Sequence, residues 1–158
     1  MLGLPSSALI CFSLATVLTA CGASNIRPWT VPFPEARVDT VDVEAASLIE
    51  RLNSHVTNTG LEVARISPEE GFLETRWFDL ATRRSRKSGG DPERVVRMRF
   101  WADPVIAGRS VLISEVVYLQ SLDPSLLPRD AETLAPPDHA GHILMTDILE
   151  AVLENSGG

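Results

Sequence analysis

The sequence has few of the residues and motifs on which enzymes rely. It contains two cysteines, three histidines and a single lysine. It has neither the Gly-x-Ser-x-Gly pattern of a nucleophile elbow nor a glycine-rich loop followed by Lys-Ser or Lys-Thr, which would cradle a phosphate. We therefore expect no catalytic residue, no cofactor and no enzymatic activity.

Long hydrophobic runs are also missing. The uncharged apolar segment Ala8–Leu18 is shorter than the roughly 20 residues that cross a membrane as a helix. A segment of this length near the start of a chain is typical of the core of a signal peptide. No charged residue occurs in the first 20 positions, so the remainder carries the whole net charge of −7. So acidic a chain is a poor binder of nucleic acid, and we expect none as a partner.

The apolar segment ends at Leu18-Thr19-Ala20-Cys21. A branched apolar residue, two small residues and a cysteine at this place resemble the lipobox of bacterial lipoproteins. The resemblance implies cleavage after Ala20 and multiple acylation of Cys21, which becomes the first residue of the mature protein. Multiple acylation matters, because a single acyl chain binds membranes only marginally.

Two alternatives to this interpretation remain open. Met1–Ser7 has no Lys or Arg, although a secretory signal normally begins with positive charge. Either the α-amino group serves alone, or translation starts upstream. The second alternative is an ordinary secretory signal cleaved near Ala20. If Cys21 is acylated, the resemblance implies sorting to the outer membrane, because Gly22 is not the aspartate that commonly retains lipoproteins at the inner membrane.

One domain is expected after the signal. The expected parts are a signal peptide over residues 1–20, a lipidated cysteine with a proline-containing tether over 21–40, and a single α+β domain over 41–158. The prolines favour an extended tether that holds the domain away from the lipid surface. The alternative is that Trp29, Val31 and Phe33 dock on the domain as an edge segment.

The domain is predicted to be a four-stranded antiparallel sheet packed by an N-terminal and a C-terminal helix, in the order α-β-β-β-β-α. Apolar residues recur in both helical segments at spacings that put them on one face. The strands are expected to form two hairpins. The predicted elements are a helix at Asp42–Thr59, strands at Leu61–Ile66, Phe72–Leu80, Arg94–Ala102 and Arg109–Leu119, and a helix from near Asp138.

The strand patterns also predict which side chains are buried. The third strand alternates between two sets that face opposite sides of the sheet: Val96, Met98 and Phe100 in one, and Arg97, Arg99 and Trp101 in the other. The fourth strand is apolar on both sides and is expected to be central. Leu52 and Trp77 are predicted to lie between the first helix and the sheet.

The strongly basic cluster of the chain lies between the two hairpins and consists of Arg83, Arg84, Arg86 and Lys87. Because it lies outside the apolar pattern, we expect it to be exposed. One interpretation is that it binds an acidic partner or lipid headgroups, since each charge near an anionic membrane is worth about 1 kcal/mol. The alternative is a solvated loop that aids solubility.

Two histidines, His139 and His142, are the only pair with a spacing that suits a metal. Zinc needs three or four converging ligands, and the sequence shows only this pair with Asp138 and Asp147 nearby. We therefore expect solvated histidines in the first turn of a helix, and no metal.

The segment Gly71-Phe72-Leu73-Glu74-Thr75-Arg76-Trp77 resembles the Gly-x-Leu-x-Thr-x-Trp strand of the lipoprotein C component of the β-barrel assembly machinery. The order of elements is similar to the helix-grip domains of small outer-membrane lipoproteins. The resemblance implies a non-catalytic, lipid-anchored envelope module facing the periplasm that binds other envelope proteins. The alternative is a module that holds a lipid or another small apolar ligand between helix and sheet. The oligomeric state is left open.

Overall fold

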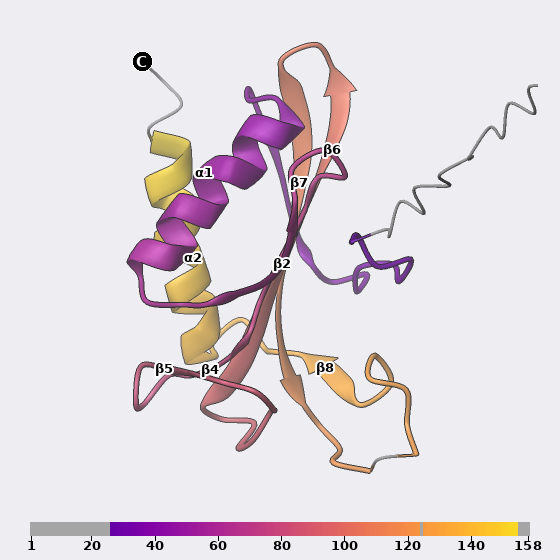
Figure 1. The fold of residues 1–158 in the computed structure, drawn as a ribbon, viewed down its shortest axis with the longest axis vertical. Coiled ribbons are helices and arrows are strands. Elements are labelled where there is room, and N and C mark those ends of the chain that lie inside the picture. Colours follow the sequence, from indigo (N-terminus) through magenta and orange to yellow (C-terminus); the bar gives the residue numbers. More distant parts are fainter. Residues whose placement is uncertain (1–25, 124, 155–158) are drawn as a thin grey trace, which may run out of the picture.

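The computed structural model describes residues 26–123 and 125–154, so the expected signal peptide and Cys21 lie outside the described residues. The described part is an α+β fold with a large antiparallel sheet and two helices, as predicted (Figure 1). The strands are β1 (Arg37–Val41), β2 (Val63–Ser67), β3 (Phe72–Thr75), β4 (Trp77–Asp79), β5 (Arg84–Arg86), β6 (Val95–Ile106), β7 (Arg109–Leu119) and β8 (Glu132–Leu134). The helices are α1 (Ala45–Asn58) and α2 (Ala140–Glu154). Neither helix is long and apolar enough to span a membrane.

The sheet has eight strands, so the predicted four-stranded sheet is too small. Its main path runs β1-β7-β6-β3-β2, and both predicted hairpins, β2–β3 and β6–β7, are present. β1 and β8 pair with opposite ends of β7, while β4 pairs with β6 and carries β5 on its other edge. The added strands β1, β5 and β8 have three to five residues each, too few for an alternating pattern to stand out.

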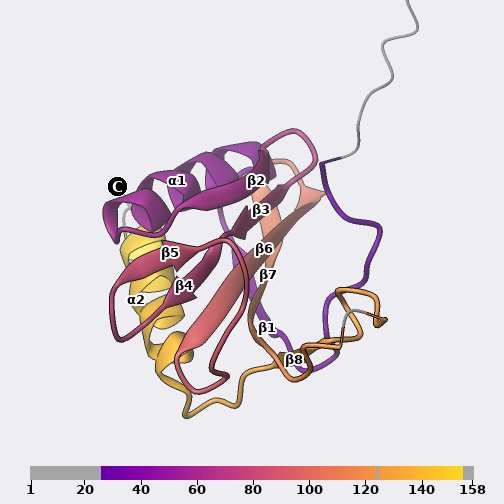
Figure 2. The same ribbon diagram turned by 60° about the horizontal axis from the view of Figure 1, so that its bottom comes forward.

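Both helices cover the same face of the sheet (Figures 1 and 2). Their apolar stripes and the facing strand residues form one hydrophobic core, in which the predicted burial of Leu52 is confirmed. Val96, Met98 and Phe100 of β6 belong to this core, as their alternation predicted. α1 begins at Ala45 rather than Asp42, because the preceding residue is extended and makes no side-chain cap.

Trp77 is buried, as predicted, but it is not in the helix-covered core, so the prediction that it lies under the first helix is wrong. It packs against Val95 and Val117 on the opposite face. The reason is a one-residue insertion at Arg76. Glu74 pairs with Arg99 and Phe78 with Val96, so four steps along β3 and β4 match three steps along β6. Such a bulge moves every later side chain to the other face.

A side chain compensates for the interrupted ladder at this bulge. The Thr75 hydroxyl oxygen accepts a hydrogen bond from the Met98 backbone nitrogen at 3.0 Å. The Arg76 backbone nitrogen instead donates to the Glu62 carbonyl oxygen at 2.7 Å. The predicted strand Phe72–Leu80 is therefore two strands, β3 and β4.

The segment expected to be a free tether is part of the folded domain. Arg37–Val41 forms β1 at the edge of β7. The preceding residues, 26–36, run along the face of the sheet away from the helices (Figures 1 and 2). Phe33 packs against the cluster around Trp77, which agrees with the docking alternative for this residue. Trp29 and Val31, in contrast, leave most of their side-chain surface exposed.

Candidate functional site

The face of the sheet away from the helices carries a group of charged side chains, which we call the ion cluster. Its members are Arg65, Glu74, Arg97, Arg99, Glu115, Arg129 and Glu132. Alternation along the strands puts six of them on one face, and Arg129 comes from the connection before β8, which lies over them together with the segment 26–36. Elements far apart in the sequence thus meet at one place.

Arg99 is the centre of the ion cluster. Its Nε donates to Glu74 Oε2 at 2.5 Å, and its Nη2 donates to Glu132 Oε1 at 2.7 Å. Arg65 Nε donates to the other oxygen of Glu74 at 3.0 Å. The Arg99 side chain and both carboxylates are almost fully buried. Charged groups are found in such surroundings only when they are paired.

The carboxylate of Glu115 ties two covering segments to the sheet. It is fully buried in β7 and accepts hydrogen bonds from Arg129 Nη1 at 3.1 Å and Nη2 at 3.0 Å. It also accepts a hydrogen bond from the backbone nitrogen of Phe33. The Arg129 guanidinium lies over the Phe33 ring, 3.7 Å from its centroid, and its Nη2 also donates to the Val31 carbonyl oxygen at 3.0 Å. The segment 26–36 is therefore fixed to the sheet through a buried charge.

The surroundings change the pKa values in the ion cluster. Burial alone would raise the pKa of Glu74, but the hydrogen bond from Arg65 and the charges of Arg99 and Arg97 outweigh it, so the pKa lies below its ordinary value. Burial would lower the pKa of Arg99, but its pairing with Glu132 and Glu74 raises it. At Arg97 burial prevails and lowers the pKa. The positive charge of Arg97 is thus the least compensated of those whose pKa is shifted.

A cavity of about 510 Å³ opens over the ion cluster. Four of the cluster's guanidinium groups line it, together with apolar side chains of the segment 26–36 and of the connection before β8. The lining residues are Arg65, Arg97, Arg99, Arg129, Pro28, Trp29, Thr30, Val31, Leu127, Pro128 and Asp130. Such a mixture of arginine and apolar groups suits an anion that carries an apolar part.

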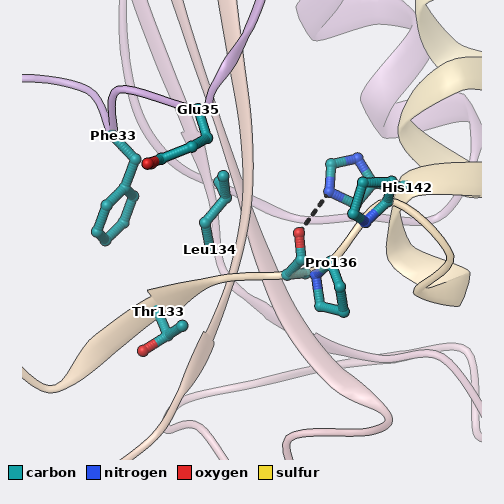
Figure 3. Close-up of a pocket in the computed structure, with 8 residues that line it drawn as sticks. Phe33, Glu35, Thr133, Leu134, Pro136 and His142 are labelled. Atoms are coloured by element: carbon teal, nitrogen blue, oxygen red, sulfur yellow. Dashed lines mark hydrogen bonds between the residues drawn. The ribbon is translucent and has the colours of Figure 1, made fainter.

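A second cavity, of about 380 Å³, lies between the segment 26–36, β8 and the start of α2 (Figure 3). Phe33, Leu134 and Pro136 give it a largely apolar wall. Figure 3 shows His142 at its edge, where its Nε2 lies 2.8 Å from the Ala135 carbonyl oxygen. This hydrogen bond occupies one of the two ring nitrogens of His142.

The two candidate metal-binding histidines do not converge. His139 Nε2 lies 3.0 Å from the Pro92 carbonyl oxygen, whereas His142 contacts Ala135. Within residues 26–123 and 125–154, no group of three or more histidine, cysteine, aspartate or glutamate side chains could hold a metal ion. Both histidines are partly exposed, and each also lies within hydrogen-bond distance of a backbone carbonyl oxygen, which the sequence did not predict.

The basic cluster Arg83, Arg84, Arg86 and Lys87 is exposed, but it is not a loop between hairpins. Arg84–Arg86 forms β5, which pairs with β4. Asp79 stabilises the β4–β5 hairpin through both of its carboxylate oxygens. Its Oδ1 accepts hydrogen bonds from the backbone nitrogens of Ala81 and Thr82. Its Oδ2 accepts a hydrogen bond from Arg94 Nη2 at 2.6 Å. The hydrogen bond from Arg94 is the main reason why the pKa of Asp79 falls to about 2.

Not all of the basic side chains point freely into solvent. Arg86 Nη1 lies 3.6 Å from Asp79 Oδ2, and Arg83 Nη2 donates to the Thr59 carbonyl oxygen at the end of α1 at 3.4 Å. Among the described residues, no ion pair is found for Arg84 or Lys87. These two side chains are the best placed to meet a partner.

Sequence reasoning missed the ion cluster as a site. One signal was present: Glu115 interrupts a strand that is otherwise apolar on both sides, and a charged residue there indicates a buried pair. No protein-family model and no curated protein matches the chain, so no site residue is assigned from a relative.

Proposed function

We propose that the protein is a lipid-anchored, non-catalytic envelope lipoprotein that acts as an interaction module for outer-membrane machinery. Cys21 is the proposed lipidation site and the periplasmic side of the outer membrane the proposed location. The position of two α-helices over one face of an antiparallel sheet supports the similarity to helix-grip lipoproteins. The partner in this proposal is another envelope protein.

The observation that carries the proposal is the fixed start of the described chain. The Arg27 guanidinium binds both carboxylate oxygens of Asp103, at 2.7 and 3.1 Å, and its backbone nitrogen donates to Glu70 Oε2 at 2.5 Å. Arg27 follows Cys21 by six residue steps, and a chain of that length spans at most roughly 20 Å. A lipid on Cys21 would therefore hold this end of the domain close to the membrane.

The basic cluster lies at the other end of the sheet. β4 of the basic hairpin pairs with β6 at Val95 and Val96, whereas Arg27 binds β6 at Asp103. Eight residues of strand span about 26 Å. Figure 2 shows the start of the described chain and β5 on opposite sides of the molecule. We therefore assign Arg84 and Lys87 to an acidic protein partner rather than to headgroups of the anchoring membrane.

The alternative function, an apolar ligand held between helix and sheet, has less support. The interface between the helices and the sheet is filled by one continuous hydrophobic cluster. Three of its members, Leu48, Leu52 and Met98, have no exposed surface. The cavity of about 510 Å³ lies on the opposite face of the sheet instead. An apolar ligand under the helices would have to displace part of the core.

Fractionation of a Cys21→Ser variant tests the anchor. We expect the wild type in the outer-membrane fraction and the variant in the soluble periplasm or unprocessed, because acyl chains provide the membrane affinity. Soluble behaviour of both proteins would refute the anchor.

A second experiment tests the orientation. A dye is attached to a single cysteine introduced as Val105→Cys or Lys87→Cys. Labelling is specific, because the only other cysteine of the proposed mature chain is Cys21, whose sulfur is blocked by acylation. With the protein in vesicles that contain headgroup-labelled acceptor lipids, we expect stronger energy transfer from position 105 than from position 87. Equal energy transfer from the two positions, or stronger transfer from position 87, would contradict the proposed orientation of the basic cluster.

A further inference from the structure

We propose that the cavity over the ion cluster binds a singly charged anionic amphiphile, with a phosphodiester or carboxylate head on the arginines and an apolar body on the rim. This inference does not need the lipid anchor or the protein partner, and it gives the far face of the sheet a role of its own.

The charges around the cavity do not balance. The ion cluster contains four guanidinium groups and three carboxylates. Asp130 also lines the cavity, but it is exposed, and the Arg65 side chain is 43% exposed, so water screens both charges. The three carboxylates of the cluster do not line the cavity, so the surface that a ligand meets carries four guanidinium groups and one exposed carboxylate, on a protein whose net charge is −7. A monoanion can therefore pair with these guanidinium groups.

Unused donors accompany this excess charge. Among the described residues, the buried Nε of Arg97 and Nη1 of Arg99 make no hydrogen bond. Arg99 Nη1 is 2.7 Å from Glu132 Oε2, close enough for an ion pair. Arg97 has fewer close oxygen acceptors: its Nη1 is 3.4 Å from Glu132 Oε1 and 3.7 Å from Glu74 Oε2, and its guanidinium lies over the Trp77 ring, 4.3 Å from the centroid. Since a buried donor without a partner is unfavourable, an oxyanion beside Arg97 would be stabilised.

The rim of the cavity is apolar and exposed. Trp29, Val31 and Leu127 line it and leave 91, 79 and 65% of their surfaces accessible. Single exposed apolar residues are common, but three around one cavity form a surface on which an apolar body can lie. The guanidinium groups of the cavity favour an oxygen anion, and the apolar rim favours a hydrocarbon group. A ligand with both parts is an amphiphile.

Isothermal titration calorimetry on the full chain in a non-ionic detergent tests the proposal. The probes are dibutyl phosphate and octanoate, which are both singly charged and carry apolar arms. The controls are tributyl phosphate, which has the arms without the charge, and inorganic phosphate, which is anionic but has no apolar arms. We expect binding of one or both probes, weaker binding of inorganic phosphate, and none of tributyl phosphate.

Two arginines provide a matched pair of variants. Arg65 lines the cavity and pairs with Glu74, whereas Arg76 lies outside it and pairs with Glu62; their side chains are 43 and 47% exposed. Arg65→Gln removes one of the four positive charges that line the cavity and leaves Glu74 paired with Arg99. We expect it to weaken probe binding roughly tenfold or more, while Arg76→Gln leaves it unchanged. Arg97→Met, with melting temperatures recorded, tests the same point at the buried donor.

Native mass spectrometry identifies the source of the ligand. Full-length protein extracted from vesicles of phosphatidylglycerol and phosphatidylcholine would retain phosphatidylglycerol if the source is the membrane. If the short probes bind but phosphatidylglycerol is not retained, the source is a soluble amphiphile. The proposal is wrong if neither probe binds, if tributyl phosphate or phosphatidylcholine binds as well as the anions, or if Arg65→Gln and Arg76→Gln behave alike.

Discussion

The two faces of the sheet are built on different principles. Under the helices, Met98 and Phe100 of β6 pack in an apolar core. On the other face Arg99, which lies between them in the sequence, is buried in a network of carboxylates. The apolar face gains free energy from burial itself, whereas each charge on the other face first loses its hydration and regains that energy only through well-placed partners.

This difference bears on function. Replacing a buried ion network with apolar residues of similar volume is often neutral or stabilising. Stability alone therefore does not explain why the far face contains seven charged residues where hydrophobic ones would serve. The helix-covered face supplies the apolar core, and we infer that the far face binds the amphiphile proposed above.

The largest effect is expected from breaking the ion cluster at one carboxylate. Glu115→Ala leaves Arg129 and the Phe33 nitrogen without their acceptor and should lower the free energy of unfolding by about 3 to 5 kcal/mol. Glu115→Gln should cost less, since an amide oxygen can still accept one of these bonds. Urea titration measures both, and a loss below about 1 kcal/mol in the alanine variant would contradict a stabilising role of the charge network.

A cavity in the apolar face should have a comparable or smaller effect. Leu52→Ala removes a fully buried side chain under α1 and should cost about 2 to 5 kcal/mol. Denaturant titration is again the measurement, with exposed Leu122→Ala as the control. A loss below about 1 kcal/mol would mean that the helix packs more loosely than the structure shows.

Undocking the segment 26–36 should have a smaller effect. Phe33→Ala removes the ring under the Arg129 guanidinium and should cost about 1 to 2 kcal/mol, because the ring is only partly buried. Limited proteolysis should then cleave this segment before the rest of the domain. Trp29→Ala, at an exposed ring, is the matched control and should leave both the stability and the cleavage pattern unchanged.

The smallest effect is a dependence of stability on pH, which separates charged from apolar contributions. The pKa of Asp79 lies at about 2 against an ordinary 3.8, and that of Glu74 lies below its ordinary 4.5. The folded state thus binds fewer protons than the unfolded state between these values, so stability is complete above about pH 5 and falls as the pH drops toward 2. Melting temperatures between pH 7 and pH 2.5 measure this.

The pH response also allows an internal comparison. Asp79→Asn should flatten the fall, whereas Leu52→Ala should lower the melting temperature at every pH without changing the slope. A change of slope in the Leu52 variant would couple the apolar core to the charges, contrary to the separation of the two faces.

The part of the fold that periodicity encodes could be predicted from the sequence. Both helices and both main hairpins follow from regular apolar spacing, and burial of Leu52 follows with them. β1, β5 and β8 are too short to show a period. The bulge at Arg76 left no local mark, and the wrong placement of Trp77 is its direct result.

The candidate site was harder to predict because its members are far apart in the sequence. Glu74, Glu115 and Glu132 lie on three different strands, and only strand pairing brings their partners together. The basic cluster was visible as a run of charges, but its role as a strand beside Asp79 was not. Contiguous charge is thus easy to read, while a site assembled across a sheet needs the register.

The turn at Gly71 offers a way to recognise relatives of this protein. Gly71 has a φ of +63°, and a Cβ atom there would lie 2.0 Å from the Ala102 carbonyl oxygen, so no other residue fits without moving the backbone. Two residues follow Gly71 at fixed positions in the sequence. Thr75 replaces the hydrogen bond that the strand ladder loses, and Trp77 lies just after the inserted residue. We expect distant homologues to keep this spacing even where the remaining sequence has diverged, which makes it an anchor for alignment.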